Sequence, residues 1–300
     1  MTSKTDNAVK NMDVITRIEQ TLIAAVARAD ARNCPPRLAA AMQHAVFPRG
    51  ARIRPRLCLA VAAACGEDDP AVTNAAAAAI ELLHCASLVH DDLPCFDDAT
   101  LRRGKLSVHA AFGEPLAVLA GDALIVLAFQ ALAWGAASMP TRLAVLLPVV
   151  AASVGVPAGI VAGQAWECEP EADLSEYQRE KTGALFAAAT CAGAAAAGAE
   201  AACWRLLGER LGEAFQVADD LRDAASSMDE IGKPVGRDLA LGRPSAVTQL
   251  GLGGAIDRLR QLAEQAVAAV PPCPGASELR AHILSETGRL LPRELALRAA

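Results

Sequence analysis

The residues best suited to chemistry are four aspartates, which fall within residues 91–98 of the segment LVHDDLPCFDDATLRRGK (88–105). An apolar run precedes this segment, and three cations follow the acids: Arg102, Arg103 and Lys105. Leu93 precedes a proline, a position that disfavours the α conformation, so a helix that reaches the aspartates should weaken near Asp92. The carboxyl end of a helix carries partial negative charge, and acids gathered there indicate that a cation is expected. For this segment alone, an acidic, solvated junction between a helix and a loop is the alternative.

A second acidic group lies in FQVADDLRDA (215–224), where helical spacing places Asp219 and Asp223 on one face with Asp220 alongside. Like charges at this spacing are mildly destabilising unless a counter-charge lies between them. Acidic helix faces are common, so the group by itself is a weak signal. The two groups stand about 120 residues apart, each joined to an apolar run, and they form a cleft lined with carboxylate oxygens if they face one another.

Carboxylate oxygens with room for water suit Mg²⁺, which binds through a few carboxylates together with substrate phosphates. Cations that could hold the remaining phosphate oxygens lie in or near the breaks flanking these helices: Arg102, Arg103, Lys105, Lys181 and Lys233. Each of these cations alone could be an ordinary surface charge. Together with the acids and the apolar runs, they predict a site for a diphosphate that carries a hydrocarbon tail.

The composition indicates what must position these groups. Hydrophobic residues make up 53% of the 300 residues and aromatic residues only 3%. Much of the apolar fraction is alanine, the best helix former, which predicts closely packed helices. Breaks rich in turn formers separate the helical segments, of which 72–90 is among the clearest, and neither a flexible linker nor a repeat divides the chain. We predict one all-α domain over residues 1–300, a helical bundle, with a flexible N-terminus at 1–12.

Charge and cysteine content exclude several classes of protein. The net charge is −6 without a basic block, which disfavours nucleic-acid binding. Nine cysteines are scattered without a C-x-x-C pair, so neither a disulfide framework nor a metal knuckle is expected. No apolar segment follows the first ten residues as a signal peptide would require. We therefore expect buried thiols and a cytoplasmic protein.

Residues 143–163 contain no charge and are long enough to cross a bilayer. Pro148, Pro157 and three glycines interrupt this stretch. A helix that is apolar all round can also be the centre of a large soluble bundle. We expect a buried core here and no transmembrane segment.

The two acidic segments resemble the first and second aspartate-rich motifs of the trans-polyprenyl diphosphate synthases. Further matches span most of the chain: GARIRP (50–55), ELLHCASLVHDD (81–92), LAGDAL (119–124), AGQ (162–164), KTGALF (181–186) and GKPVGRD (232–238). Pro94 and Cys95 widen the first motif by two residues, as in bacterial members. The chain is most similar to the bacterial geranylgeranyl diphosphate synthases of carotenoid and bacteriochlorophyll synthesis.

This resemblance implies an all-α homodimer of the isoprenoid synthase type, with a helical bundle around a central apolar cavity. It implies a head-to-tail condensation of isopentenyl diphosphate with an allylic diphosphate, which uses Mg²⁺, three ions once diphosphate is bound. The metal ligands that it implies are Asp91, Asp92, Asp97, Asp219, Asp220 and Asp223.

The resemblance also assigns the cations and the polar neutral residues. Arg102, Lys181 and Lys233 would place positive charge on the allylic diphosphate, and Arg54, His84 and Arg103 match the isopentenyl diphosphate site. Thr182 and Gln216 would line the path of the allylic cation. A satisfied core residue is the alternative for His84, although its seven-residue spacing to Asp91 would let both face one cavity.

The chain departs from the family pattern at four positions. Ala51 stands where a lysine usually contacts isopentenyl diphosphate, which puts affinity for that substrate in doubt. Arg237 and Arg243 replace lysines, and Glu167 replaces an aspartate.

Product length should depend on the depth of the cavity below the first aspartates. Ala86 and Ser87 lie about one turn before Asp91 and are both small. One turn is about 5.4 Å, close to the reach of one isoprene unit, so small residues here favour a C20 product over C15. Small residues also serve close helix packing, which keeps the C15 alternative open.

Other activities remain as alternatives. Terpene cyclases usually replace the second aspartate cluster, which is intact here, and squalene-type enzymes would lack Lys181-Thr182 and the segment 50–55. A non-catalytic subunit of a prenyl synthase would tend to lose carboxylates from one cluster.

Overall fold

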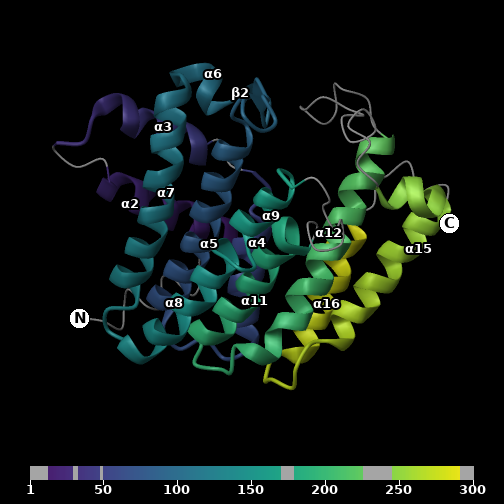
Figure 1. Cartoon of the computed structure of the whole chain (residues 1–300). Helices are drawn as coiled ribbons and strands as arrows, with labels where there is room; N and C mark the ends of the chain where they lie inside the picture. Colours follow the sequence, from purple (N-terminus) through teal and green to yellow (C-terminus); the bar gives the residue numbers. More distant parts are fainter. Residues whose placement is uncertain (1–12, 30–32, 48–49, 170–178, 226–244, 291–300) are drawn as a thin grey trace. The chain divides into compact units, whose positions relative to one another are not determined.

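A computed structural model describes residues 13–29, 33–47, 50–169, 179–225 and 245–290 (Figure 1). Apart from one short hairpin, every regular element in these ranges is helical, which confirms the all-α class. The chain divides into two compact units, Met1–Ala151 with Ala189–Ala201, and Ala152–Ala188 with Ala202–Ala300. That residues 1–300 act as one domain therefore stays a prediction, and the predicted flexible segment 1–12 lies outside the described residues.

The first unit holds the first aspartate motif. Its elements are α2 (Val14–Ala29), α3 (Pro36–Val46), α4 (Ile53–Ala64), α5 (Pro70–Asp91), β1 (Leu101–Arg102), β2 (Lys105–Leu106), α6 (Val108–Phe112), α7 (Glu114–Gly135), most of α8 (Pro140–Val154) and the end of α11 (Ala184–Ala196).

Helix α5 carries the first aspartates at its C-terminal end. Its start is fixed by Asp69, whose carboxylate accepts hydrogen bonds from the amides of Ala71 (3.0 Å) and Val72 (3.4 Å), and by a proline in the first turn. The alanines at 75–79 are buried, which matches the close packing that the composition predicts. The helix ends at Asp91, as predicted from the proline at 94.

Helices α5 and α7 lie side by side (Figure 1). At one end, a Cβ on Gly121 would fall 2.1 Å from Nε2 of His90, and at the other end a Cβ on Gly135 would fall 2.2 Å from Cβ of Ala75. The second contact requires glycine, because a backbone carbonyl of α5, that of Ala71, also lies within 3.1 Å, whereas a side chain at 121 would only displace the imidazole of His90. Because sequence position rises along α7 while it falls along α5, the two helices are antiparallel, and Gly135 allows them to approach closely at one end.

The hairpin directly after the first aspartate motif was not predicted. Leu101 pairs with Leu106 and Arg102 with Lys105. The two turn residues, Arg103 (φ 53°) and Gly104 (φ 75°), both have positive φ, as a tight type I′ connection requires. The turn therefore places two predicted substrate ligands, Arg102 and Arg103, at fixed positions beside α5.

The second unit holds the second aspartate motif. Its elements are α9 (Ile160–Trp166), the π-helical turn η1 (Arg179–Gly183), the start of α11, the 3₁₀ turn η2 (Ala202–Trp204), α12 (Arg205–Ala225), α15 (Ala246–Ala268) and α16 (Ala276–Gly288). Helix α12 packs on α15 through a buried cluster that includes Val217, Leu221, Leu259 and Leu262. The serine at 245 caps α15 by a reciprocal hydrogen-bond pair with Thr248.

The uncharged stretch 143–163 does not form one long helix. Helix α8 ends at Val154 and α9 begins at Ile160, after Gly159 in a positive-φ conformation (136°). Val145 is 44% exposed and Val161 54%, so the expectation of a wholly buried core helix is wrong for this stretch. Among the described residues, α5 and α7 instead have the length and apolar character of membrane spans, with 78% and 44% of their most apolar windows buried in the protein.

Candidate active site

The loop that follows α5 folds back on the helix end and gathers the first aspartates. The amide of Asp97 donates a hydrogen bond to the carbonyl of Asp91 (2.9 Å), and the amide of Ala99 donates to the carbonyl of Asp92 (3.1 Å). Asp98 adopts a left-handed conformation (φ 46°) at the bend. The backbone thus brings the predicted metal ligands Asp91, Asp92 and Asp97 into one turn, although five residues separate the first from the last.

Asp92 is buried and paired with Arg102. The Nε of Arg102 donates to Oδ1 of Asp92 at 2.9 Å, and Nη2 donates to the same oxygen. Burial raises the pKa of Asp92, and the guanidinium of Arg102 opposes this rise. Arg102 therefore lies directly beside a predicted metal ligand, where it can contact the same diphosphate.

The donor set of this turn fits Mg²⁺. Its side chains offer carboxylate oxygens, the ligands that this hard cation prefers. Within the described part of the chain, no three carboxylate, imidazole or thiol groups converge closely enough to hold an ion alone. Mg²⁺ commonly takes one or two carboxylates and completes its shell with water and substrate phosphates, so a preformed cage is not required.

Three predicted ligands of isopentenyl diphosphate lie together in the first unit. Nη1 of Arg54, in the first turn of α4, lies 3.4 Å from Nε2 of His84 on α5. The charge of Arg103 acts on both groups: with burial as the largest cause, the pKa of Arg54 falls to about 10 and that of His84 well below its usual value. At neutral pH Arg54 is thus charged and His84 neutral, and the cluster presents cationic donors to an anion.

Gly50 and Ala51 border this cluster. A Cβ on Gly50 would lie 2.5 Å from Cζ of Arg103, so the absence of a side chain at 50 makes room for the guanidinium. Ala51 is exposed beside it. The position where the family usually has lysine is therefore open to solvent next to the cationic cluster.

In the second unit, a hydrogen-bonded chain orients Gln216. Oγ1 of Thr182 donates to Oε1 of Gln216 (3.1 Å), and Nε2 of Gln216 donates to Oδ1 of Asp220 (3.0 Å). Gly212, one turn before Gln216 on α12, permits this contact, because a Cβ there would lie 2.8 Å from Cα of Gly183 in η1. The two residues predicted to line the cation path are thus adjacent.

The three aspartates of the second motif have different surroundings. Asp219 pairs with Arg222 at 3.3 Å, which supplies the counter-charge that the i, i+4 spacing requires. Asp220 is 6% exposed, and its Oδ2 accepts a hydrogen bond from the amide of Ala246 (2.7 Å) at the start of α15. Asp219 and Asp223 lie on the same helix, α12, as predicted. Asp220 thus also joins α12 to α15, a role that its position in the motif did not indicate.

Lys181 is held by an acid that the sequence identified only as a departure from the family pattern. Its Nζ lies 2.8 Å from Oε1 of Glu167, whose Oε2 accepts a hydrogen bond from Nε2 of Gln164 (2.6 Å). Lys181 and Thr182 both stand in the π-helical turn η1, a local irregularity that often marks functional sites. The AGQ and KTG segments are therefore neighbours in space.

Several predictions are not decided by this geometry. Lys233, Arg237 and Arg243 lie outside the described residues. Ala86 is buried (1% exposed) and Ser87 donates from its hydroxyl to the carbonyl of His84 (2.9 Å), but a tail cavity beside them stays a prediction. The two aspartate motifs belong to different units, so their convergence also stays a prediction.

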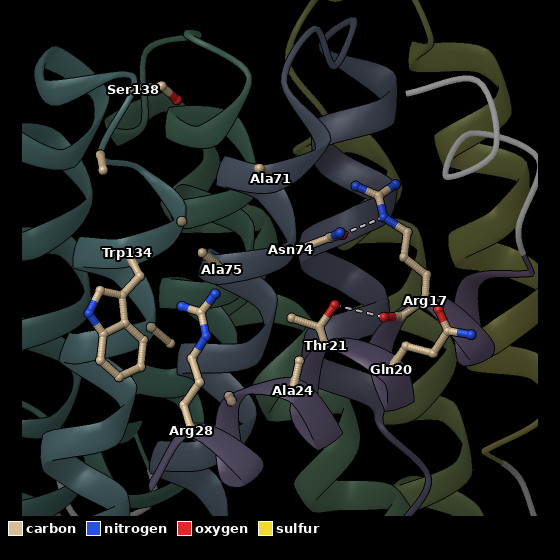
Figure 2. Close-up of a pocket in the computed structure, with 14 residues that line it drawn as sticks. Arg17, Gln20, Thr21, Ala24, Arg28, Ala71, Asn74, Ala75, Trp134 and Ser138 are labelled. Carbon is tan, nitrogen blue, oxygen red and sulfur yellow. Dashed lines mark hydrogen bonds between the residues drawn. The ribbon is translucent and has the colours of Figure 1, made fainter. Parts of the chain in front are cut away.

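A cavity of about 580 Å³ lies at the other end of α5 (Figure 2). Alanines from α2 and α5 line it together with Arg17, Arg28 and Trp134. Its nearest α5 residue to the aspartates is Ala75, 16 residues before Asp91 and thus about 24 Å along the helix. The cavity is therefore separate from the first aspartate motif.

The chain is similar to known proteins over most of its length. The family model described as "Polyprenyl synthetase" matches residues 35–272. The geranylgeranyl diphosphate synthase of Cereibacter sphaeroides is 53% identical over 282 residues, which is 94% of this chain and 98% of that protein. The geranylgeranyl diphosphate synthase of Rhodobacter capsulatus is 52% identical over 268 residues, 89% of this chain and 93% of that protein.

A solved structure has the same fold. The geranyltransferase of Helicobacter pylori, complexed with magnesium and isoprenyl diphosphate, is 28% identical with a TM-score of 0.76 over 93% of this chain and 99% of that one. The matched residues 35–272 include both aspartate motifs and the segments that hold Arg54, His84 and Lys181. The chain belongs to the polyprenyl synthetase family.

Proposed function

We propose that this protein is a Mg²⁺-dependent geranylgeranyl diphosphate synthase, which condenses isopentenyl diphosphate head to tail with allylic diphosphates to a C20 product. The observation that carries the proposal is the turn that gathers Asp91, Asp92 and Asp97 at the end of an apolar helix in a chain of this family. The similarity to two synthases of this name over about nine-tenths of the chain or more supports the product class.

The two aspartate motifs hold the metal in this proposal. Asp91, Asp92 and Asp97 of the first motif and Asp219, Asp220 and Asp223 of the second would bind Mg²⁺, three ions once diphosphate is bound. Bound Mg²⁺ supplies Lewis-acid neutralisation of the departing diphosphate. The oxygen-only donor sets of both motifs support this assignment.

The remaining charges bind the allylic substrate and favour ionisation of its C–O bond. Arg102, Lys181 and Lys233 place fixed positive charge where the leaving diphosphate becomes more negative. Glu167 holds Lys181 in place, and the hydrogen bond from Thr182 orients Gln216. Thr182 and Gln216 are neutral and offer dipoles to the allylic cation. Neither is a nucleophile strong enough to trap the cation.

Arg54, His84 and Arg103 bind the diphosphate of isopentenyl diphosphate. With this substrate held, its terminal alkene carbon forms a bond to C1 of the allylic cation. A proton then leaves the carbon adjacent to the new cationic centre, and the departed diphosphate accepts it. The product is an allylic diphosphate five carbons longer.

The C20 product rests on the small residues Ala86 and Ser87 before the first motif. A farnesyl diphosphate synthase, which stops at C15, is the second candidate, because small side chains at these positions also serve helix packing.

We further propose that two copies form a homodimer in the cytoplasm without a membrane-spanning segment. Helix α7 exposes four large apolar side chains: Val118 (42%), Leu119 (52%), Val126 (56%) and Trp134 (42%). A second copy would cover this surface from water. All nine cysteines lie in described residues, and none forms a disulfide there, which supports a reducing compartment.

The purified chain should be incubated with MgCl₂, isopentenyl diphosphate and each of the C5, C10 and C15 allylic diphosphates. Chromatography of the dephosphorylated products should show geranylgeraniol from every primer. Farnesol as the end product would support the C15 alternative. A cyclic hydrocarbon, or no elongation, would contradict the proposal in favour of a cyclase or a non-catalytic subunit.

The proposed dimer is tested by light scattering of Val126→Asp beside the wild type. The charge introduced at 126 should weaken association of the two copies.

A further inference from the structure

A buried arginine, Arg52, connects four helices next to the cluster of Arg54, His84 and Arg103. The side chain of Arg52 is fully buried, and its Nη1 donates to Oε1 of Glu81 on α5 at 2.6 Å. Its Nε donates to Oε1 of Glu19 on α2 (2.9 Å), and its Nη2 donates to the carbonyl of Val46 at the end of α3 (2.9 Å). Arg52 itself precedes α4, so one guanidinium joins α2, α3, α4 and α5.

The backbone at Arg52 directs the first turn of α4. Arg52 has left-handed torsion angles (φ 51°, ψ 37°), uncommon for a residue with a side chain. No side-chain hydrogen bond caps the start of α4. The three contacts of the guanidinium therefore hold the residue from which α4 begins, two positions before Arg54.

Two contacts from this segment reach α5 at neighbouring positions. Arg52 contacts Glu81, and Arg54 lies 3.4 Å from Nε2 of His84. Glu81 and His84 are three residues apart, which places them on one face of α5. The first contact sets the register of α4 against α5, and the second depends on that register.

Glu81 is also a buried negative charge that acts on the cluster. Its carboxylate is 1% exposed and acts electrostatically on Arg54. Arg54 and Arg103 repel one another, so they need a negative group nearby. Arg52 holds the Glu81 carboxylate in place through a hydrogen bond to its Oε1.

We propose that Arg52 is a positioning residue for the second substrate: together with Glu81 it fixes Arg54 and His84 in the geometry that binds isopentenyl diphosphate. This inference rests on the proposed role of Arg54, His84 and Arg103. In this proposal two neighbouring arginines have different roles: Arg54 contacts the diphosphate, and Arg52 holds Arg54 in position without contacting the substrate.

The test must separate positioning from stability. Arg52→Met removes the guanidinium and leaves Glu81 buried without its partner. It should therefore both destabilise the protein and raise KM for isopentenyl diphosphate. Arg52→Met/Glu81→Met replaces the buried pair by apolar groups of similar volume, which is often neutral or stabilising. The double variant should be more stable than Arg52→Met, although Glu19 and the carbonyl of Val46 still lose a donor. It should still show KM for isopentenyl diphosphate raised about tenfold, with KM for the allylic substrate changed less than about twofold.

A second buried ion pair, formed by Arg17 of α2 with Glu67, provides the matched control. Nη1 of Arg17 donates to Oε2 of Glu67 at 3.0 Å, and Nε of Arg17 donates to the side chain of Asn74, at the far end of α5 (Figure 2). Both partners are largely buried. Arg17→Met/Glu67→Met should leave KM for isopentenyl diphosphate unchanged, because this pair holds no residue of the cluster.

The outcomes decide between the roles. A double variant Arg52→Met/Glu81→Met with the wild-type KM for both substrates would overturn the proposal, as would an equal rise in both KM values. If this variant does not fold, Arg52→Lys provides the test, because lysine keeps the positive charge but lacks the planar guanidinium with its several donors. Arg52→Lys should raise KM for isopentenyl diphosphate at least about threefold. A wild-type KM in Arg52→Lys would equally overturn it. Arg54→Gln is the reference: if it leaves this KM unchanged, the proposed substrate site is wrong, whatever Arg52 does.

Discussion

Nζ of Lys181 donates a hydrogen bond to Oε1 of Glu167 at 2.8 Å, and this contact joins the π-helical turn η1 to the end of α9. The carboxylate fixes the position of the ammonium group before any substrate binds. Lys181→Ala should lower kcat by about 10² to 10³, the usual effect of removing one preorganised group that stabilises developing charge. Steady-state kinetics with farnesyl and isopentenyl diphosphates measure this. Glu167→Asp keeps the charge and should lose much less, and an equal loss in both variants would contradict a direct role for Lys181.

The first motif offers an internal comparison between acids. Asp91→Asn should lower kcat by at least about 10², because a metal-bearing carboxylate is lost from the site. Asp98 lies in the same loop but occupies its left-handed bend (φ 46°), a conformation that asparagine tolerates well. Asp98→Asn should therefore retain activity. Measurement of kcat against MgCl₂ concentration distinguishes the two variants. Only Asp91→Asn should need a higher MgCl₂ concentration for half-maximal activity.

Ala86 should limit the length of the product. Ala86→Phe fills the space about one turn before Asp91, and the largest product should shorten from C20 to C15. The side chain of Ala86 is 1% exposed, so the substitution should also lower the melting temperature. Ala71→Phe, at the exposed start of the same helix, is the control and should leave the products unchanged. An unchanged product spectrum in Ala86→Phe would count against the predicted cavity.

Ala51 should weaken the binding of isopentenyl diphosphate. Ala51→Lys adds a cation at an exposed position beside Arg54 and Arg103. One charge-assisted hydrogen bond contributes about 1.5 kcal/mol, so KM for isopentenyl diphosphate should fall about tenfold. KM for the allylic substrate should not change. A similar decrease in both KM values would instead indicate a general electrostatic effect.

His84 should make stability depend on pH. Its pKa in the folded protein lies well below the usual value because of burial, with Arg54 and Arg103 adding repulsion. As pH falls below about 6.5, the unfolded chain binds a proton that the folded protein does not, so the free energy of unfolding should decrease by up to about 1.4 kcal/mol per pH unit. Urea denaturation measures the slope, which His84→Gln should reduce. The exposed His282→Gln should leave it unchanged.

The sequence predicted the parts of the fold that local chemistry decides. The proline at 94 correctly placed the end of α5, and i, i+4 spacing correctly placed Asp219 and Asp223 on one helix. Two contacts could not be predicted. The hydrogen bond from Ala246 to Asp220 and the ion pair of Arg52 with Glu81 each join segments about 26 to 29 residues apart, and no local pattern determines such partners.

The stretch 143–163 shows why composition alone misled. It is uncharged throughout, but the structure divides it between α8 and α9 and exposes Val145 and Val161. An apolar side chain can face the core of its own chain or water, and hydropathy does not distinguish these environments. Helix α7, with its exposed Val126, illustrates the same ambiguity.

The glycine contacts between α5 and α7 restrict how this enzyme can be re-engineered. A side chain at 121 would displace the imidazole of His90, the residue directly before Asp91, and a side chain at 135 would clash with Ala75 and with the backbone carbonyl of Ala71. Substitutions intended to alter specificity should therefore avoid the glycines of α7 that contact α5. Substitutions that enlarge residue 135 would force α5 and α7 apart, whatever product they were designed for.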